Sequence, residues 1–156
     1  AAESLAPEEV VRWMERFLDS THAAVRRSGG QVTQFIGDCS MAAWVLEPAK
    51  PPIDAIAIGR ELIRQIRLAL DAAAERHGPR LWIRVGVAKG ECVIDEVGTR
   101  IGRVVGAAWF RLQQTPGCAG VPGDAMLIDG SLVPDAGANL LKDVGGGFCR
   151  VIDVER

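Results

Sequence analysis

The sequence lacks the cysteine and histidine pattern of a disulfide framework or a zinc site. None of its four cysteines belongs to a CxxC pair, and only two histidines could join them. Scaffolds of either kind place such groups at short, regular spacings. We therefore expect reduced, buried thiols and a cytoplasmic setting. The residues concerned are Cys39, Cys92, Cys118, Cys149, His22 and His77.

A long apolar run and an excess of charge of one sign are also lacking. No run approaches the roughly 18 residues that would span a bilayer, and no signal peptide is visible. The net charge of -2 gives no overall attraction to nucleic acid or to an anionic membrane. We expect this domain neither to bind nucleic acid nor to insert into a membrane, although a longer parent protein could be tethered. An anionic ligand would need a local site.

What the sequence contains fits one globular domain over residues 1–156. Hydrophobic residues make up 48% and charged residues 24% of the chain. A chain of this length can bury a substantial core without disulfides. The tryptophans are Trp13, Trp44, Trp82 and Trp109, and no stripe of basic residues accompanies them. We assign them to the core or to a dimer interface and not to base stacking.

Two segments have the apolar spacing of amphipathic helices. In Pro7–Arg27 the proline suits the first turn, and Gly29-Gly30 ends the pattern. A second helix is expected over Ile53–His77, with Gly59 as a weak interior point. Its inner side is expected to consist of Ile56, Leu62, Ile63, Ile66, Leu70 and Ala73.

The segments between and after the helices have the pattern of strands. Gln31–Ile36 and Cys39–Leu46 flank Gly37-Asp38, which predicts a hairpin. Alternation over Leu81–Val87 predicts a half-buried strand, and a turn should join it to Cys92–Val97 as a second hairpin. We also expect a short helix at Ala107–Gln114, a loop at Pro116–Asp124, and strands at Ala125–Ile128, Asn139–Val144 and Phe148–Val154. This order favours an α+β sandwich, with a mostly antiparallel sheet and helices on one face.

Four segments match one protein family in order and spacing. They are Ala2–Val11, Gly29–Asp38 (GGQVTQFIGD), Arg84–Val93 (RVGVAKGECV) and Leu141–Val144 (LKDV). Through them the chain resembles the class III nucleotidyl cyclases, the adenylate and guanylate cyclases. The resemblance implies the ferredoxin-like sandwich of that family.

The resemblance also implies an activity, a cofactor and a partner. The 3′-hydroxyl of a purine nucleoside triphosphate would attack the α-phosphate, giving a 3′,5′-cyclic monophosphate and pyrophosphate. Two Mg²⁺ or Mn²⁺ ions would assist, because hard cations bind carboxylate oxygens and neutralise phosphate charge. The family acts as a homodimer with its sites at the subunit interface. We expect ATP in preference to GTP.

Three residues match family positions that bind metal or phosphate. Asp38 matches the second metal-binding aspartate, and we expect it to hold the metal and to act in catalysis. An aspartate after a glycine is also ordinary turn chemistry, which is the alternative. Arg111 takes the place of the catalytic, phosphate-binding arginine. Lys142 takes the place of the lysine that reaches the triphosphate, and its compact charge suits a phosphate tail.

Two further residues match positions that read the purine base. Gln34 stands where the family has lysine or glutamate, and its amide offers both a donor and an acceptor, so we expect weak discrimination. Gln34 could equally be an exposed polar residue on an alternating strand. Arg103 aligns with the partner position, where an arginine cannot accept a hydrogen bond from an adenine amino group.

Two departures from the family pattern leave the activity open. The first-strand segment with the other metal aspartate lies upstream of Ala1 in the family, so we expect a truncated sequence or a lost strand. Ala107 falls where the family has its ribose-orienting asparagine, and poor positioning would slow the reaction. Two hypotheses follow: an active cyclase, or a degenerate cyclase domain that binds nucleotide, dimerises or regulates.

Overall fold

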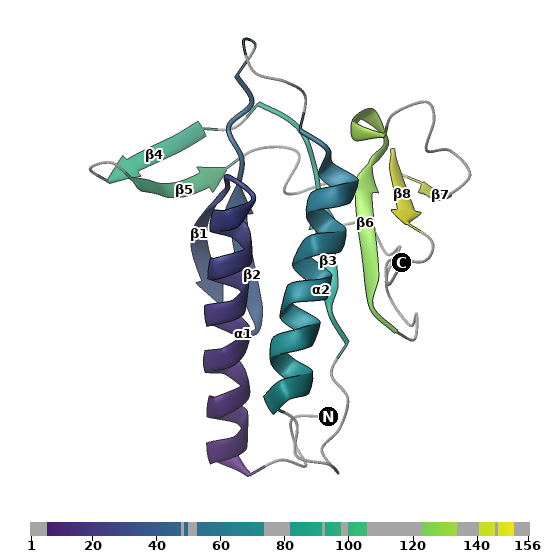
Figure 1. Ribbon diagram of the computed structural model, residues 1–156. Coiled ribbons are helices and arrows are strands. Elements are labelled where there is room, and N and C mark those ends of the chain that lie inside the picture. Colours follow the sequence, from purple (N-terminus) through teal and green to yellow (C-terminus); the bar gives the residue numbers. More distant parts are fainter. Residues whose placement is uncertain are drawn as a thin grey trace.

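A computed structural model describes residues 6–47, 49, 53–73, 82–91, 93–97, 100–105, 123–133, 141–145 and 147–151. In chain order its elements are α1 (Pro7–Arg27), β1 (Gln31–Ile36), β2 (Cys39–Ala43), α2 (Ala55–Ala73), β3 (Arg84–Val87), β4 (Val93–Val97), β5 (Arg100–Val105), β6 (Ala125–Asp129), the 3-10 helix η2 (Gly130–Leu132), β7 (Leu141–Gly145) and β8 (Phe148–Val151), as Figure 1 shows. The expected helix at Ala107–Gln114 and most of the expected loop at Pro116–Asp124 lie outside the described residues.

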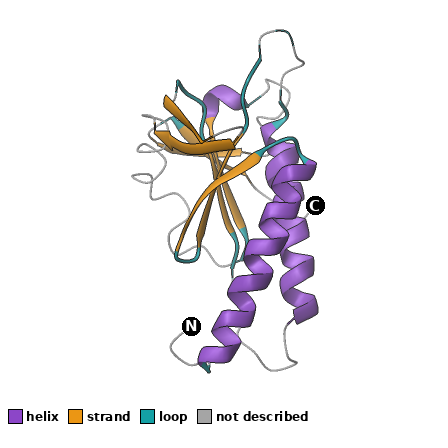
Figure 2. Cartoon of the chain, turned by 90° about the vertical axis from the view of Figure 1, so that its left-hand side faces the viewer, coloured by secondary structure: helices purple, strands orange, loops and turns teal. Residues whose placement is uncertain are grey.

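The two helices lie side by side on one side of the strands, so the molecule has a helix layer and a strand layer (Figure 2). One sheet has the strand order β3-β6-β8-β7, in which β3 and β6 are parallel and the other neighbours are antiparallel. The pairs β1–β2 and β4–β5 are both antiparallel. The expected α+β sandwich is therefore confirmed. None of the described helices is both long and apolar enough to span a bilayer.

Helix α1 begins and ends where the sequence predicts. Glu8 and Glu9 lie in its first turn, where carboxylates favour the positive end of the helix dipole, and the Glu9 carboxylate accepts the backbone N–H of Ala6 at 3.0 Å. At the other end Gly29 has a φ of 81°, a conformation that favours glycine. The backbone N–H of Gly30 donates to the carbonyl of Val25 at 2.9 Å. The chain can thus turn directly into β1.

Helix α2 carries the main core on its inner side. The Asp54 carboxylate accepts the backbone N–H of Ala57 at 2.9 Å and caps the helix. Gly59, expected to be a weak point, has a packing role: a Cβ added there would lie 2.3 Å from Cε of Met126 on β6. The small residue lets helix and sheet approach closely. As expected, the buried inner residues are Ile56, Leu62, Ile63, Ile66 and Leu70.

The core lies between α2 and the four-stranded sheet. Every residue of β6 is buried, and Phe148, Met126 and Ile128 have 0% exposure. Trp13 packs against this core and Trp44 against a smaller cluster between α1 and the β1–β2 hairpin, as expected. Trp82 is 46% exposed, so a core position is wrong for it. Trp109 lies outside the described residues.

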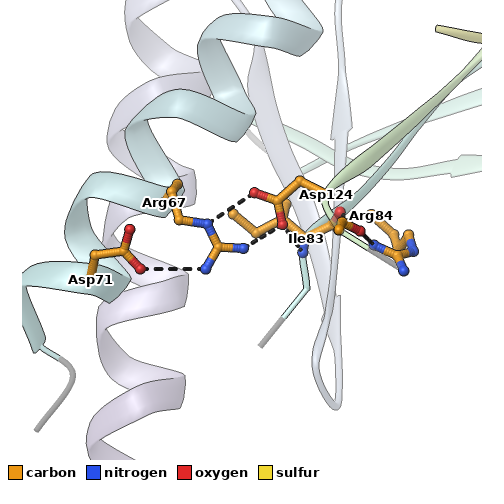
Figure 3. A network of polar contacts seen from close by, with 6 residues as sticks. Arg67, Asp71, Ile83, Arg84 and Asp124 are labelled. Atoms are coloured by element: carbon orange, nitrogen blue, oxygen red, sulfur yellow. Dashed lines mark hydrogen bonds and ion pairs between the residues drawn. The ribbon is translucent and has the colours of Figure 1, made fainter. Parts of the chain in front are cut away.

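A buried ion pair ties α2 to the residues directly before β3 and β6 (Figure 3). The Asp124 side chain is 1% exposed and accepts hydrogen bonds from Nε and Nη2 of Arg67, whose side chain is 12% exposed. The same carboxylate accepts the backbone N–H of Ile83 at 2.8 Å. Arg67 also contacts Asp71 on its own helix at 3.5 Å. The parallel strands therefore start from one fixed point.

The expected second hairpin is wrong in its pairing. Strand β3 pairs in parallel with β6, and β4 pairs with β5, a strand that the sequence analysis did not predict. A parallel neighbour is distant in sequence, so a hairpin pattern cannot reveal it. The β1–β2 hairpin is confirmed, although β2 ends at Ala43, earlier than expected.

Candidate functional site

Asp38 lies at the tip of the β1–β2 hairpin. The strands close with Ile36 opposite Cys39, which leaves Gly37 and Asp38 as a two-residue turn. Gly37 has a φ of 56°, a left-handed conformation that tight hairpin turns require. Asp38 is exposed, so its carboxylate faces solvent from a fixed backbone position. The tip can therefore present an oxygen ligand to a bound cation.

A β-bulge directs Gln34 away from the helices. Val32 is opposite Ala42 but Gln34 is opposite Met41, so one extra residue lies between them on β1. Val32 and Ala42 pack toward α1. Because cross-strand partners share a face, Gln34 and Met41 lie on the opposite face from that pair. Gln34 is exposed, which is consistent with both alternatives, a base-reading residue and an ordinary surface residue.

Arg103 lies on β5, the strand that contacts β1 (Figure 1). In the β4–β5 pair it is directly opposite Asp95. The two expected base-reading positions, Gln34 and Arg103, therefore come from neighbouring strands. Arg111 and Ala107 lie outside the described residues.

Lys142 lies on a different sheet from the β1–β2 hairpin. It is an exposed residue of β7, the last strand of the order β3-β6-β8-β7, and β8 and β6 separate it from β3. Figure 1 shows β7 on one side of α2 and the β1–β2 hairpin on the other. One chain therefore does not bring Asp38 and Lys142 together.

The hairpin tip has a second polar group, the Cys39 thiol. Partial desolvation of the sulfur, and secondly the negative charge of Asp38, raise the pKa of this thiol above its ordinary value. A raised pKa keeps the thiol protonated at neutral pH, and a protonated thiol is a poor metal ligand. Cys39 is exposed and Cys149 half-buried, so the expectation of fully buried thiols is wrong for both.

The described residues fit only part of a metal centre. They contain no group of three His, Cys, Asp or Glu side chains that could hold an ion. Mg²⁺ is often held by one or two carboxylates together with substrate phosphates and water. Asp38 as a single exposed carboxylate fits that arrangement, in which the nucleotide supplies most of the oxygens.

A cavity of about 400 Å³ lies at the opposite end of the same hairpin. The Trp44 ring packs against Gly30 there, and its Nε1 donates to the carbonyl of Ser28 at 3.1 Å. No sequence motif indicates this cavity. Its lining comprises Ser28, Gly29, Gly30, Gln31, Ala43, Trp44, Val45, Glu47 and Ile53. It is separated from Asp38 by the length of the two strands.

Comparison with known proteins identifies the fold. No protein-family model matches the chain, and no curated protein matches it either. Among solved structures, the chain is similar to the crystal structure of the guanylyl cyclase Cya2, with 20% sequence identity and a TM-score of 0.68. The similarity covers 96% of this chain and 83% of that chain. The chain therefore has a cyclase-like fold, as its four sequence segments led us to expect.

Proposed function

We propose that this chain is the catalytic domain of a cytoplasmic nucleotidyl cyclase that converts a purine nucleoside triphosphate into a 3′,5′-cyclic monophosphate and pyrophosphate. The observation that carries the proposal is Asp38, exposed at the tip of a tight hairpin in a fold shared with a guanylyl cyclase. That position matches the metal-binding aspartate of the family. The proposal keeps ATP as the preferred substrate, with weak selectivity because the Gln34 amide can pair with either purine edge.

In this proposal the residues divide between metal, phosphate and base. Asp38 would hold Mg²⁺ or Mn²⁺ with the phosphates; when bound, the cations lower the pKa of the 3′-hydroxyl and offset phosphate charge. Arg111 and Lys142 would hold the phosphates. Gln34 and Arg103 would lie against the base. Each side chain acts by positioning and by charge, which supply most of the catalysis in phosphoryl transfer.

The separation of Asp38 from Lys142 supports a site shared between two copies. Asp38 ends the hairpin on one side of α2, and β7 lies on the other side (Figure 1). In a two-fold dimer each site would take Asp38 from one copy and Arg103, Arg111 and Lys142 from the other. The proposed enzyme is therefore a homodimer.

The test is cyclic nucleotide production from ATP and from GTP with Mn²⁺, by the parent chain, Asp38→Asn and Asp38→Ala. Loss of a metal ligand should lower the rate at least about 100-fold, since several kcal/mol of charge stabilisation disappear. Asp19→Asn removes an exposed carboxylate from α1 and should leave the rate unchanged. A product that survives Asp38→Ala would refute the assigned role. The enzyme proposal would be overturned if no product formed and if nucleotide affinity changed neither on addition of Mn²⁺ nor in Asp38→Ala.

The second candidate is a degenerate cyclase domain that binds nucleotide or dimerises without catalysis. It is favoured by the single carboxylate at the hairpin tip, because the described residues hold no cluster of three metal-ligating side chains. Such a domain would bind the triphosphate without turning it over. Equilibrium dialysis with ATP, run beside the rate assay, separates the two candidates.

A further inference from the structure

Lys142 and Arg150 lie directly opposite each other in the antiparallel pair β7–β8. Cross-strand partners share a face and have Cβ atoms about 5 Å apart, and like charges in this arrangement repel. Lys142 is exposed and Arg150 half-buried. Within the part of the chain that the structure describes, neither side chain makes a hydrogen bond or an ion pair. The fold thus holds two adjacent cations with no carboxylate between them.

The register also identifies the face on which the two cations lie. The next row of the sheet, Leu141–Val151–Met126, packs into the core beneath α2. Because side chains alternate, Lys142 and Arg150 lie on the face away from the helices. Their row continues through Leu127, which is buried, to Gly86, which has no side chain. The positive charge is therefore concentrated at the β7 end of the row.

Among the described residues, two nearby carboxylates have other partners. Asp143 follows Lys142 on β7 and lies on the opposite face, where its Oδ1 accepts the backbone N–H of Gly145 at 2.8 Å. Asp129 at the end of β6 is 4% exposed, and its Oδ1 accepts the N–H and the hydroxyl of Ser131 at 3.0 and 2.8 Å. Neither carboxylate neutralises the two cations, so a bound anion would remove their repulsion.

We propose that Lys142 and Arg150 together form a polyphosphate-binding pair, and that Arg150 is a second phosphate contact of the nucleotide site. This inference rests on the proposed function, which places Lys142 at the triphosphate. A guanidinium binds two phosphate oxygens through parallel N–H groups, whereas an ammonium acts as a compact charge. Two cations side by side can each bind a different phosphate group of one chain. The pair therefore selects diphosphates and triphosphates over monophosphates, and it also suits the leaving pyrophosphate.

The first measurement is calorimetric titration of inorganic tripolyphosphate and of monophosphate into the parent chain, Lys142→Gln and Arg150→Gln. The parent chain should bind tripolyphosphate more tightly than monophosphate. Each substitution should weaken tripolyphosphate binding about 10-fold to 100-fold, the worth of one charged hydrogen bond. Arg64→Gln removes an exposed cation from α2, on the helix side, and serves as the matched control. Equal weakening by Arg64→Gln and Arg150→Gln would overturn the inference, because binding would then follow net charge alone.

A second measurement separates this inference from the proposed function. The KM for ATP should rise about 10-fold or more in Arg150→Gln. Arg150→Lys should recover only part of this loss, because lysine keeps the positive charge but lacks the two parallel N–H donors of the guanidinium. Cyclic nucleotide formed with an unchanged KM in Arg150→Gln would overturn the phosphate contact and leave the cyclase proposal standing. Tripolyphosphate binding that depends on Arg150, in a chain that forms no cyclic nucleotide, would support the pair and overturn the cyclase proposal.

Discussion

Removing one partner of the buried Arg67–Asp124 ion pair should cost several kcal/mol of folding stability, in contrast to removing one partner of an exposed pair on the same helix. Asp124→Ala removes three accepted hydrogen bonds at once, two from Arg67 and one from the backbone N–H of Ile83. The Arg67 side chain, which is 12% exposed in the parent chain, would keep its 3.5 Å contact to Asp71 but lose the buried carboxylate that faces it. Removing one partner of a buried pair costs about 3–5 kcal/mol, because the remaining charge is desolvated without compensation. That is a large share of the roughly 5–15 kcal/mol that stabilises a domain.

Urea unfolding followed by circular dichroism measures the loss, with thermal unfolding as a second readout. For a chain of this size, about 3–5 kcal/mol corresponds to a fall in Tm of roughly 6–20 °C. Arg67→Met should also destabilise the fold, and the double variant should lose less than the sum of the single losses, because both substitutions remove the same interaction. Asp124→Asn keeps an acceptor for the Ile83 N–H and should lie between Asp124→Ala and the parent chain.

Arg64–Glu61 provides the matched control. It is also a bidentate pair on α2, but its side chains are 59% and 45% exposed. Solvent screens exposed pairs of this kind, so Glu61→Ala should change stability much less than Asp124→Ala. If Asp124→Ala cost no more than Glu61→Ala, the Arg67–Asp124 pair would not be the point that fixes the starts of β3 and β6.

Three further changes test the geometry around Gly59 and the hairpin tip. Gly59→Ala places a Cβ 2.3 Å from Met126 Cε and should cost about 1 kcal/mol of urea stability despite the better helix propensity, with recovery when Met126→Val makes room. Gly37→Ala should cost about 1 kcal/mol because its φ is 56°, and Gly37→Asn should cost less. Burial and, secondly, the Asp38 charge raise the pKa of the Cys39 thiol, so Asp38→Asn removes the smaller cause and alkylation by iodoacetamide should move to lower pH. An unshifted pH profile would contradict the coupling between Asp38 and Cys39.

The sequence was a reliable guide to elements whose cause is local. Pro7, the two acidic residues after it and Gly29-Gly30 delimit α1, and each acts on the backbone within a few residues. The apolar spacing of α2 likewise identified its buried side. The role of Gly59 could not be predicted from neighbouring residues, because it depends on packing against Met126, a residue distant in the sequence. Helix propensity alone predicted a weak point in the helix, whereas the glycine allows close packing against β6.

Strand pairing was less accessible because it depends on distant partners. The turn after β3 resembles the connection of a hairpin, but β3 pairs in parallel with β6 and β4 turns back into β5. In β5, two arginines and Gly102 interrupt the apolar pattern that identifies a strand. A parallel neighbour leaves no local signature at all, so only the folded chain reveals it.

The candidate site likewise has residues that local sequence could place and residues that it could not. Asp38 could be placed at a hairpin tip from Gly37-Asp38 and the flanking strands, and the structure confirms that position. The bulge that determines on which face of the hairpin Gln34 lies could not be predicted from the sequence. It is a register mismatch between two strands and not a property of one strand. Arg150 could not be identified as a candidate for a similar reason. It lies opposite Lys142 only because of the register between β7 and β8, and no sequence motif reveals that register.

If Asp38 and Lys142 act in one site contributed by two copies, two inactive variants should restore each other's activity. Asp38→Ala keeps an intact Lys142, and Lys142→Gln keeps an intact Asp38. Mixed in equal amounts, half of the dimers would be mixed, and each of these would have one intact site out of two. The mixture should therefore recover about a quarter of the parent rate, given a two-fold symmetric dimer. Two copies of Asp38→Ala carrying different tags should recover nothing, which is the control for contamination. Failure of the mixture to recover any rate, with mixed dimers demonstrated by co-purification of the two tags, would mean that each site is built within one chain. The separation of the hairpin from β7 by α2 would then have to be closed by a rearrangement of the chain.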